Sequence, residues 1–119
     1  MTTEFVSVPP NVTVADAIMK LRAFPGEVDV INTIYLVEAH GKLVGAVPLV
    51  ALVLAAPTTR MGTLSPGQLI YCNTNASDKE VAEMFDKYNL MSLPIVDDEG
   101  SLAGVVTADD IISMLHARH

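Results

Sequence analysis

Residues 35–48 read YLVEAHGKLVGAVP, and residues 94–107 read PIVDDEGSLAGVVT. The two stretches align with a constant offset, which places Gly41 opposite Gly100 and also matches the second glycine of each stretch. Each stretch has two short apolar runs around a polar turn with glycine, which is the pattern of a β-hairpin. A repeat this regular predicts two copies of one supersecondary unit packed together, and binding sites then tend to lie in the cleft between the copies.

Composition limits what the chain can be. Its 119 residues are 50% hydrophobic and 18% charged, so we expect one compact domain or two small halves that share a core. The net charge of −7 disfavours nucleic acid as a partner, because a phosphate backbone requires a basic surface. Cys72 is the single cysteine, which excludes an internal disulfide.

Neither a signal peptide nor a membrane span is expected. The N-terminus lacks a basic region followed by an apolar core. The longest apolar run, residues 46–56, contains Pro48 and is too short for a bilayer, which needs about 20 residues. We therefore expect this stretch of chain to be soluble.

The first copy predicts a β-α-β-β-α order. Pro9 and Pro10 stop the first strand, Thr13 is suited to cap the helix that follows, and Pro57 closes the second helix. The five expected elements are a strand, a helix, two hairpin strands and a helix at residues 5–8, 13–23, 34–37, 43–47 and 49–56.

The second copy follows the same order. Ser77 and Glu80 fit a capping box, and the apolar residues after them recur at the spacing of one helix face. The expected elements are a strand at 69–72, a helix from 77, hairpin strands at 93–96 and 102–106, and a helix at 109–115. The predicted fold class is α/β (α+β), with the two repeats at residues 1–56 and 69–119, a linker at 57–68, and pseudo-two-fold symmetry.

The hairpins carry a family resemblance. The runs LPIVDDEG at residues 93–100 and GVVTADDI at 104–111 resemble the CBS domain, and two copies resemble a CBS pair, or Bateman module. The runs IYLVE at 34–38, AAPTT at 55–59 and EVAEMFDKYN at 80–89 are similar to the cytosolic CBS region of MgtE-type magnesium transporters.

The resemblance implies a regulatory role rather than an enzyme activity. In the MgtE family the CBS pair lies on the cytoplasmic side of the membrane, forms a homodimer and contacts adjacent domains of the transporter chain. It binds Mg²⁺ through acidic side chains, and loss of the ions opens the pore. Contact with the membrane comes only through the full-length protein. Some members of the family also bind ATP.

Thr107 and Asp110 are the candidate nucleotide-binding residues. They match the Gly-x-x-Thr-x-x-Asp pattern of a CBS nucleotide site, in which the threonine meets phosphate and the aspartate accepts ribose hydroxyls. The alternative is that Thr107 caps the last helix and the acids complement the helix dipole. The first copy has Pro48 and Ala51 at these places, so we expect weak or absent binding of ATP or AMP.

Asp110, Asp109 and Glu80 are the candidate Mg²⁺ ligands. Mg²⁺ prefers oxygen ligands, keeps several waters and needs one or two carboxylates. Most acidic residues lie in the second copy, but Lys79, Asn89 and other residues stand where the family often has carboxylates. The sequence therefore predicts fewer or weaker Mg²⁺ sites than in the family.

The expected helix at residues 49–56 is apolar on every side, so one sheet face cannot cover it. We interpret it as a contact to a second copy or to a neighbouring domain, with a fully buried core helix as the alternative. Three functions remain open: an Mg²⁺-sensing module of a magnesium transporter, an adenine-nucleotide-sensing module of another protein, and a dimerisation module whose ligand sites have decayed.

Overall fold

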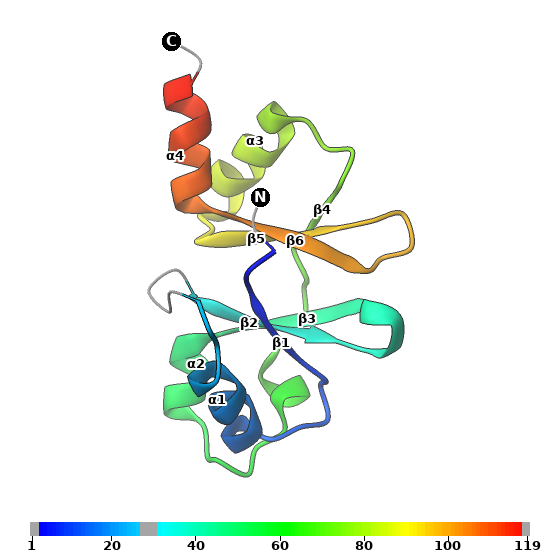
Figure 1. Ribbon diagram of the computed structural model, residues 1–119, viewed down its shortest axis with the longest axis vertical. Coiled ribbons are helices and arrows are strands. Elements are labelled where there is room, and N and C mark those ends of the chain that lie inside the picture. The colour runs from blue at the N-terminus through cyan, green and yellow to red at the C-terminus, as the bar shows by residue number, and fades with distance from the viewer. Residues whose placement is uncertain (1–2, 27–30, 118–119) are drawn as a thin grey trace.

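The computed structural model describes residues 3–26 and 31–117 of the chain. It consists of two small sheets that face each other, each covered on its outer face by helices (Figure 1). This is the mixed α and β class that the sequence predicts, with the β-α-β-β-α order repeated. No helix within the described ranges is long and apolar enough to cross a membrane.

The first repeat forms a sheet in the order β1-β2-β3. Strand β1 runs parallel to β2, and β2 pairs with β3 in an antiparallel hairpin. The 3₁₀ turn η2 (Ala39–Gly41) joins β2 and β3. The elements are β1 (Val6–Val8), α1 (Val14–Arg22), β2 (Thr33–Val37), β3 (Leu43–Pro48) and α2 (Leu49–Leu54).

The second repeat has the same topology, in the order β4-β5-β6. Its β4 is parallel to β5, and β5 pairs with β6 in a hairpin. The elements are β4 (Cys72–Asn73), α3 (Asp78–Tyr88), β5 (Ser92–Val96), β6 (Leu102–Thr107) and α4 (Ala108–Ala117). Another 3₁₀ turn, η3 (Met61–Leu64), lies in the connection between the repeats.

The predicted helix starts are confirmed. The Thr13 hydroxyl accepts from the Asp16 N–H, and the Asp16 carboxylate accepts from the Thr13 N–H, which makes a full capping box. The Ser77 hydroxyl likewise accepts from the Glu80 N–H. The Glu80 carboxylate, however, accepts from the Ser77 hydroxyl instead of the backbone, so only half of the predicted box forms.

Several predicted boundaries differ from the structure, including those of α4, which spans Ala108–Ala117 rather than residues 109–115. Strand β4 comprises Cys72–Asn73 rather than residues 69–72, because the chain before it runs across the first repeat, where the Ser65 hydroxyl accepts from the Ala46 N–H. Helix α2 ends at Leu54 rather than Ala56. Proline disfavours helical backbone in the residue before it, and Pro57 therefore limits how far this helix can extend.

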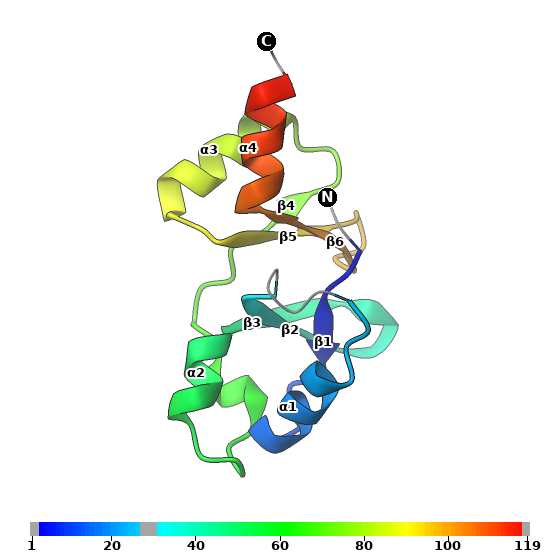
Figure 2. The ribbon, with the colours of Figure 1, turned by 60° about the vertical axis from the view of Figure 1, so that its left-hand side comes forward.

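The inner faces of the two sheets share a core. Tyr35 and Leu43 from the first repeat pack with Val96 and Val105 from the second. Figure 2 shows the helices on the outer faces and the two sheets stacked between them. The two hairpin turns also meet, because the Leu43 N–H donates to the Gly100 carbonyl. The repeats therefore form one folded unit.

Candidate functional site: the cleft between the repeats

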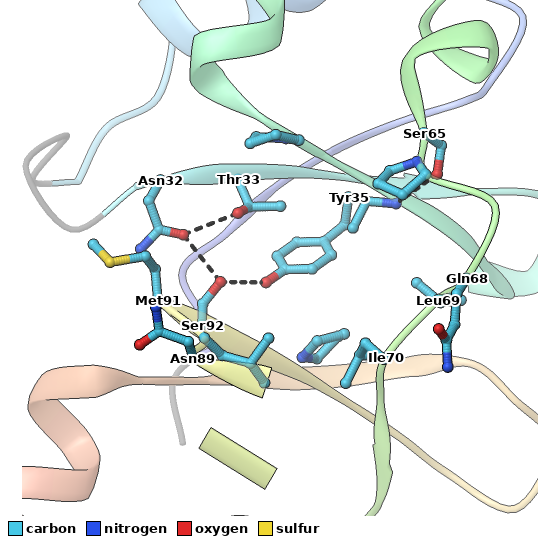
Figure 3. A pocket seen from close by; sticks show the side chains of 15 residues that line it. Asn32, Thr33, Tyr35, Ser65, Gln68, Leu69, Ile70, Asn89, Met91 and Ser92 are labelled. Atoms are coloured by element: carbon cyan, nitrogen blue, oxygen red, sulfur yellow. Dashed lines mark hydrogen bonds between the residues drawn. The ribbon is translucent and has the colours of Figure 1, made fainter. Parts of the chain in front are cut away.

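A cleft of about 290 Å³ opens between the two sheets (Figure 3). Its walls come from β2 and β3, from the connection between the repeats, and from the residues around the start of β5. This is the position between copies at which the sequence repeat predicts a binding site.

A chain of hydrogen bonds that joins three hydroxyls and one side-chain amide crosses one end of the cleft. The Asn32 Oδ1 atom accepts from Thr33 Oγ1 at 2.9 Å and from Ser92 Oγ at 3.0 Å. Ser92 Oγ lies 2.8 Å from the Tyr35 hydroxyl. Figure 3 marks these hydrogen bonds with dashed lines. A serine hydroxyl has one proton, so the Tyr35 O–H is the donor to Ser92. The chain ties the first repeat to the second.

Burial keeps the Tyr35 hydroxyl protonated. Tyr35 is 2% exposed, and this desolvation raises its pKa to about 12, although the hydrogen bond with Ser92 acts in the opposite direction. At neutral pH the hydroxyl is therefore a neutral hydrogen-bond donor.

The described residues that line the cleft include no charged side chain. Its polar groups are amides and hydroxyls, such as Asn32, Ser92 and Gln68, and the rest are mostly aliphatic residues and prolines. A phosphate group would find no cation here, and a metal ion would find no carboxylate. The chemistry of this cleft fits an uncharged ligand.

The symmetry-related position beside Thr107 is nearly closed. The space there is about 20 Å³, lined in part by Phe5, Tyr35 and Ser92. Thr107 Oγ1 accepts from the Asp110 N–H at 3.3 Å, and Asp110 Oδ2 accepts from the Thr107 N–H at 3.0 Å. This reciprocal pair is the helix-cap arrangement that the sequence left open as the alternative to nucleotide binding.

Of the three predicted Mg²⁺ ligands, one lines a groove and two are exposed on α4 and α3. Asp110 lines a groove of about 320 Å³ on the outer face of the second sheet, together with Asp78. Asp109 is exposed in the first turn of α4, and Glu80 is exposed on α3, bonded to Ser77. The described residues contain no group of three acidic, histidine or cysteine side chains that could hold a metal ion.

The donor set of the groove matches Mg²⁺ better than that of the cleft does. Mg²⁺ needs only one or two carboxylates and keeps its remaining waters, so Asp78 and Asp110 are suitable in chemical type. Asp110 already accepts from the Thr107 N–H, and a metal would share that oxygen or use the other one.

Comparison with known proteins identifies the fold. Residues 1–57 and 64–117 each match the CBS domain family. The chain belongs to this family. The expected CBS pair is thereby confirmed.

The relatives of this CBS pair include magnesium transporters. It is 36% identical to the magnesium transporter MgtE of Thermus thermophilus over 117 residues, and 31% identical to MgtE of Bacillus subtilis over 115 residues. These alignments cover 98% and 97% of this chain but 26% of each relative, so the chain spans about a quarter of their length.

A solved structure agrees with these sequence matches. The cytosolic domain of the Mg²⁺ channel MgtE in complex with ATP superposes with a TM-score of 0.90 and 35% identity. The match covers 96% of this CBS pair and 46% of that chain. The predicted likeness to the MgtE cytosolic region is confirmed.

Sequence reasoning missed the polar chain in the cleft. The sequence patterns place Tyr35 on a strand and in the family resemblance, and they do not mark Asn32 or Ser92 as site residues. The repeat does place Ser92 directly before the second hairpin, at the edge that faces the first copy. No local pattern shows which hydroxyls from distant segments meet, because that depends on how the two sheets stack.

Proposed function

We propose that this CBS pair is the regulatory, cytosolic module of an MgtE-like magnesium transporter. In this proposal it senses Mg²⁺ and passes the signal to the transport domain by rearrangement of a homodimer. The observation that carries the proposal is the match to MgtE relatives across nearly the whole chain, with a TM-score of 0.90 to an MgtE cytosolic domain.

Charge distribution supports Mg²⁺ as the signal. Nine of the fourteen acidic residues lie in residues 69–119, and Asp78, Glu80, Asp109 and Asp110 occupy the first turns of α3 and α4. Carboxylates at helix starts are stabilised by the helix dipoles, but they repel one another when two such helices are close. A divalent cation at this end of the molecule relieves that repulsion.

A regulatory role also agrees with the ionisable groups. Burial raises the pKa of the Cys72 thiol, with a further contribution from Glu80, and Tyr35 is held protonated as described above. Both shifts make these groups weaker nucleophiles at neutral pH. The proposed module acts through binding rather than catalysis.

The direct test is calorimetric titration of residues 1–119 with MgCl₂, followed by sedimentation velocity with and without Mg²⁺. We expect saturable binding and a compaction or a change in association state upon binding. Heat no greater than that of matched NaCl, together with unchanged sedimentation, would contradict the Mg²⁺-sensing function.

The cleft between the sheets supports a second candidate function, sensing of an adenine compound. Its volume suits a small ligand, but the uncharged lining offers no partner for a triphosphate. If the cleft is a sensor, adenosine should bind more tightly than ATP in parallel titrations. Tight ATP binding, with a dissociation constant of about 10 µM or less (roughly −7 kcal/mol), would show that residues outside this cleft hold the phosphates.

A further inference from the structure

The first repeat is closed by a side chain that does not belong to its β-α-β-β-α unit. Met61, from η3, is completely buried in the first core and packs there with residues from α1, β2 and β3. Its N–H donates to the Val12 carbonyl, and the Gly62 N–H donates to the Pro10 carbonyl, both at 2.8 Å. The segment around Met61 therefore acts as a plug with defined backbone bonds.

The second repeat has a surface equivalent to the one that Met61 covers, and among the described residues no side chain from outside this repeat lies on it. The caps Thr13 and Ser77 are equivalent, as are the strand residues Val8 and Cys72, which pair with matching positions of β2 and β5. With this correspondence, the residues around Met61 in the first repeat are equivalent to residues that line the groove on the second repeat. Its equivalent residues are Thr74 for Pro10, Ala76 for Val12, Asp78 for Val14, Val81 for Ala17, Ile95 for Leu36 and Val106 for Val47.

The floor of the groove on the second repeat is buried, although less completely than the equivalent residues of the first repeat. Leu36 and Val47 beneath Met61 are 1% and 0% exposed, whereas the equivalent Ile95 and Val106 are 4% and 7% exposed. The groove measures about 320 Å³ and has an apolar floor. A side chain the size of methionine would cover this floor as Met61 covers the first one.

Acidic residues at the rim of the groove favour a basic residue next to the apolar residue in any segment that binds there. In the first repeat Arg60 donates to the Asn11 carbonyl and is attracted by Asp16, whose pKa it helps to lower after the larger effect of the hydrogen bonds from Thr13. The equivalents of Asn11 and Asp16 are Asn75 and Glu80. The groove on the second repeat also has the carboxylates of Asp78 and Asp110, at positions where the first repeat has Val14 and Ala51.

We propose that the outer groove of the second repeat binds a peptide segment from outside residues 1–119 that carries a basic residue followed by a methionine-sized apolar residue. The segment lies as residues 59–62 lie on the first repeat, with the apolar side chain on Val81, Ile95 and Val106. The basic side chain lies beside Glu80. Its backbone N–H groups donate to the carbonyls of Ala76 and Thr74.

The test uses a synthetic peptide with the sequence of residues 57–65 and methyl NMR of residues 1–119. We expect saturable shifts at the methyls of Val81, Ile95 and Val106. The methyls of Leu36 and Val47, which Met61 already covers, serve as the internal control and should stay unchanged.

Two changes separate the apolar and the charged contributions. Replacing methionine by serine in the peptide should weaken binding at least tenfold, because the apolar side chain supplies the buried surface. Glu80→Gln in the protein should weaken it about twofold to fivefold, as expected for an exposed ion pair. Glu83→Gln, an exposed change on the same helix, is the matched control and should leave the affinity unchanged.

A double-mutant cycle tests the charged contact. A peptide with glutamine in place of arginine should bind equally to the parent protein and to Glu80→Gln. Three outcomes would overturn the proposal: no saturable shift, the same shifts with MgCl₂ alone, or shifts that follow protein concentration without peptide. The last two would assign the groove to a metal ion or to a second copy of the chain.

Discussion

In the first repeat Met61 from the connection covers the outer core, whereas in the second repeat the described residues around the equivalent groove all belong to that repeat and include Asp78 and Asp110. The two repeats have the same strand order and the same hairpin register. The difference therefore arises from side chains and not from topology. The first repeat is closed by a side chain from the connection, and the second has a groove with carboxylates at its rim and a buried apolar floor.

Removing the Met61 side chain should have the largest effect on stability. Met61→Ala deletes a completely buried side chain, so we expect the free energy of unfolding to fall by about 2–5 kcal/mol. Met19→Ala is the control because Met19 is 63% exposed, and its effect should remain within about 0.5 kcal/mol. Urea denaturation measures both. Equal effects of the two variants would show that Met61 does not close the first repeat.

The second prediction tests the outer surface of α2. Val53 and Leu54 are more than four-fifths exposed, so the outer face of this apolar helix is uncovered in the single chain. If this surface joins two copies, Val53→Glu should raise the dimer dissociation constant roughly tenfold to a hundredfold, by loss of about 1.5–3 kcal/mol of apolar burial.

Sedimentation equilibrium measures this dissociation constant. Met19→Glu, an exposed change on α1, should leave it unaltered. Leu52→Glu is unsuitable, because Leu52 is buried in the first core and its loss would test folding instead of association. A parent protein that is monomeric at micromolar concentration would contradict the predicted homodimer.

The third prediction concerns the acidic rim of the second repeat. Mg²⁺ at about ten times its dissociation constant should stabilise the fold by roughly 1.4 kcal/mol, which corresponds to several degrees in melting temperature. NaCl of matched ionic strength should have a smaller effect, because screening is not coordination.

Two aspartates of α4 allow a matched comparison for this effect. Asp110→Asn should reduce the Mg²⁺-dependent increase in melting temperature. Asp109 is exposed outside the groove, so Asp109→Asn should reduce this increase less. Each increase is measured against the same variant without Mg²⁺, which corrects for the loss of the Thr107 cap. An increase no larger than that with NaCl would contradict Mg²⁺ binding.

The smallest expected effect is at the contact between the repeats. Tyr35→Phe removes the hydrogen bond to Ser92 and should cost about 0.5–1.5 kcal/mol, while Tyr71→Phe at an exposed position serves as the control. The Tyr35 pKa of about 12 lies above the ordinary value of about 10. The unfolded chain therefore loses this proton first, and stability falls as the pH rises through this interval.

The loss of stability at alkaline pH should be smaller in Tyr35→Phe than in the parent protein. Thermal melts between about pH 9 and pH 11 would measure it. Parallel pH profiles for the two proteins would show that Tyr35 ionises as it does in the unfolded chain.

The sequence alone determined the repeat, the hairpins and the helix starts. Glycine at the turns, hydroxyls at Thr13 and Ser77, and apolar residues at fixed spacing act over a few neighbouring residues, so their effect can be read locally. The same local patterns carried the likeness to the CBS family that the comparisons confirmed.

Only the tertiary structure decided which repeat is closed and where the cleft lies. Met61 reaches the first core through the connection between repeats, and Tyr35 meets Ser92 across 57 positions of sequence. The start of β4 also depends on the path of this connection. These outcomes follow from the stacking of two sheets and the path of one connection, which depend on the packing of distant side chains rather than on the preferences of neighbouring residues.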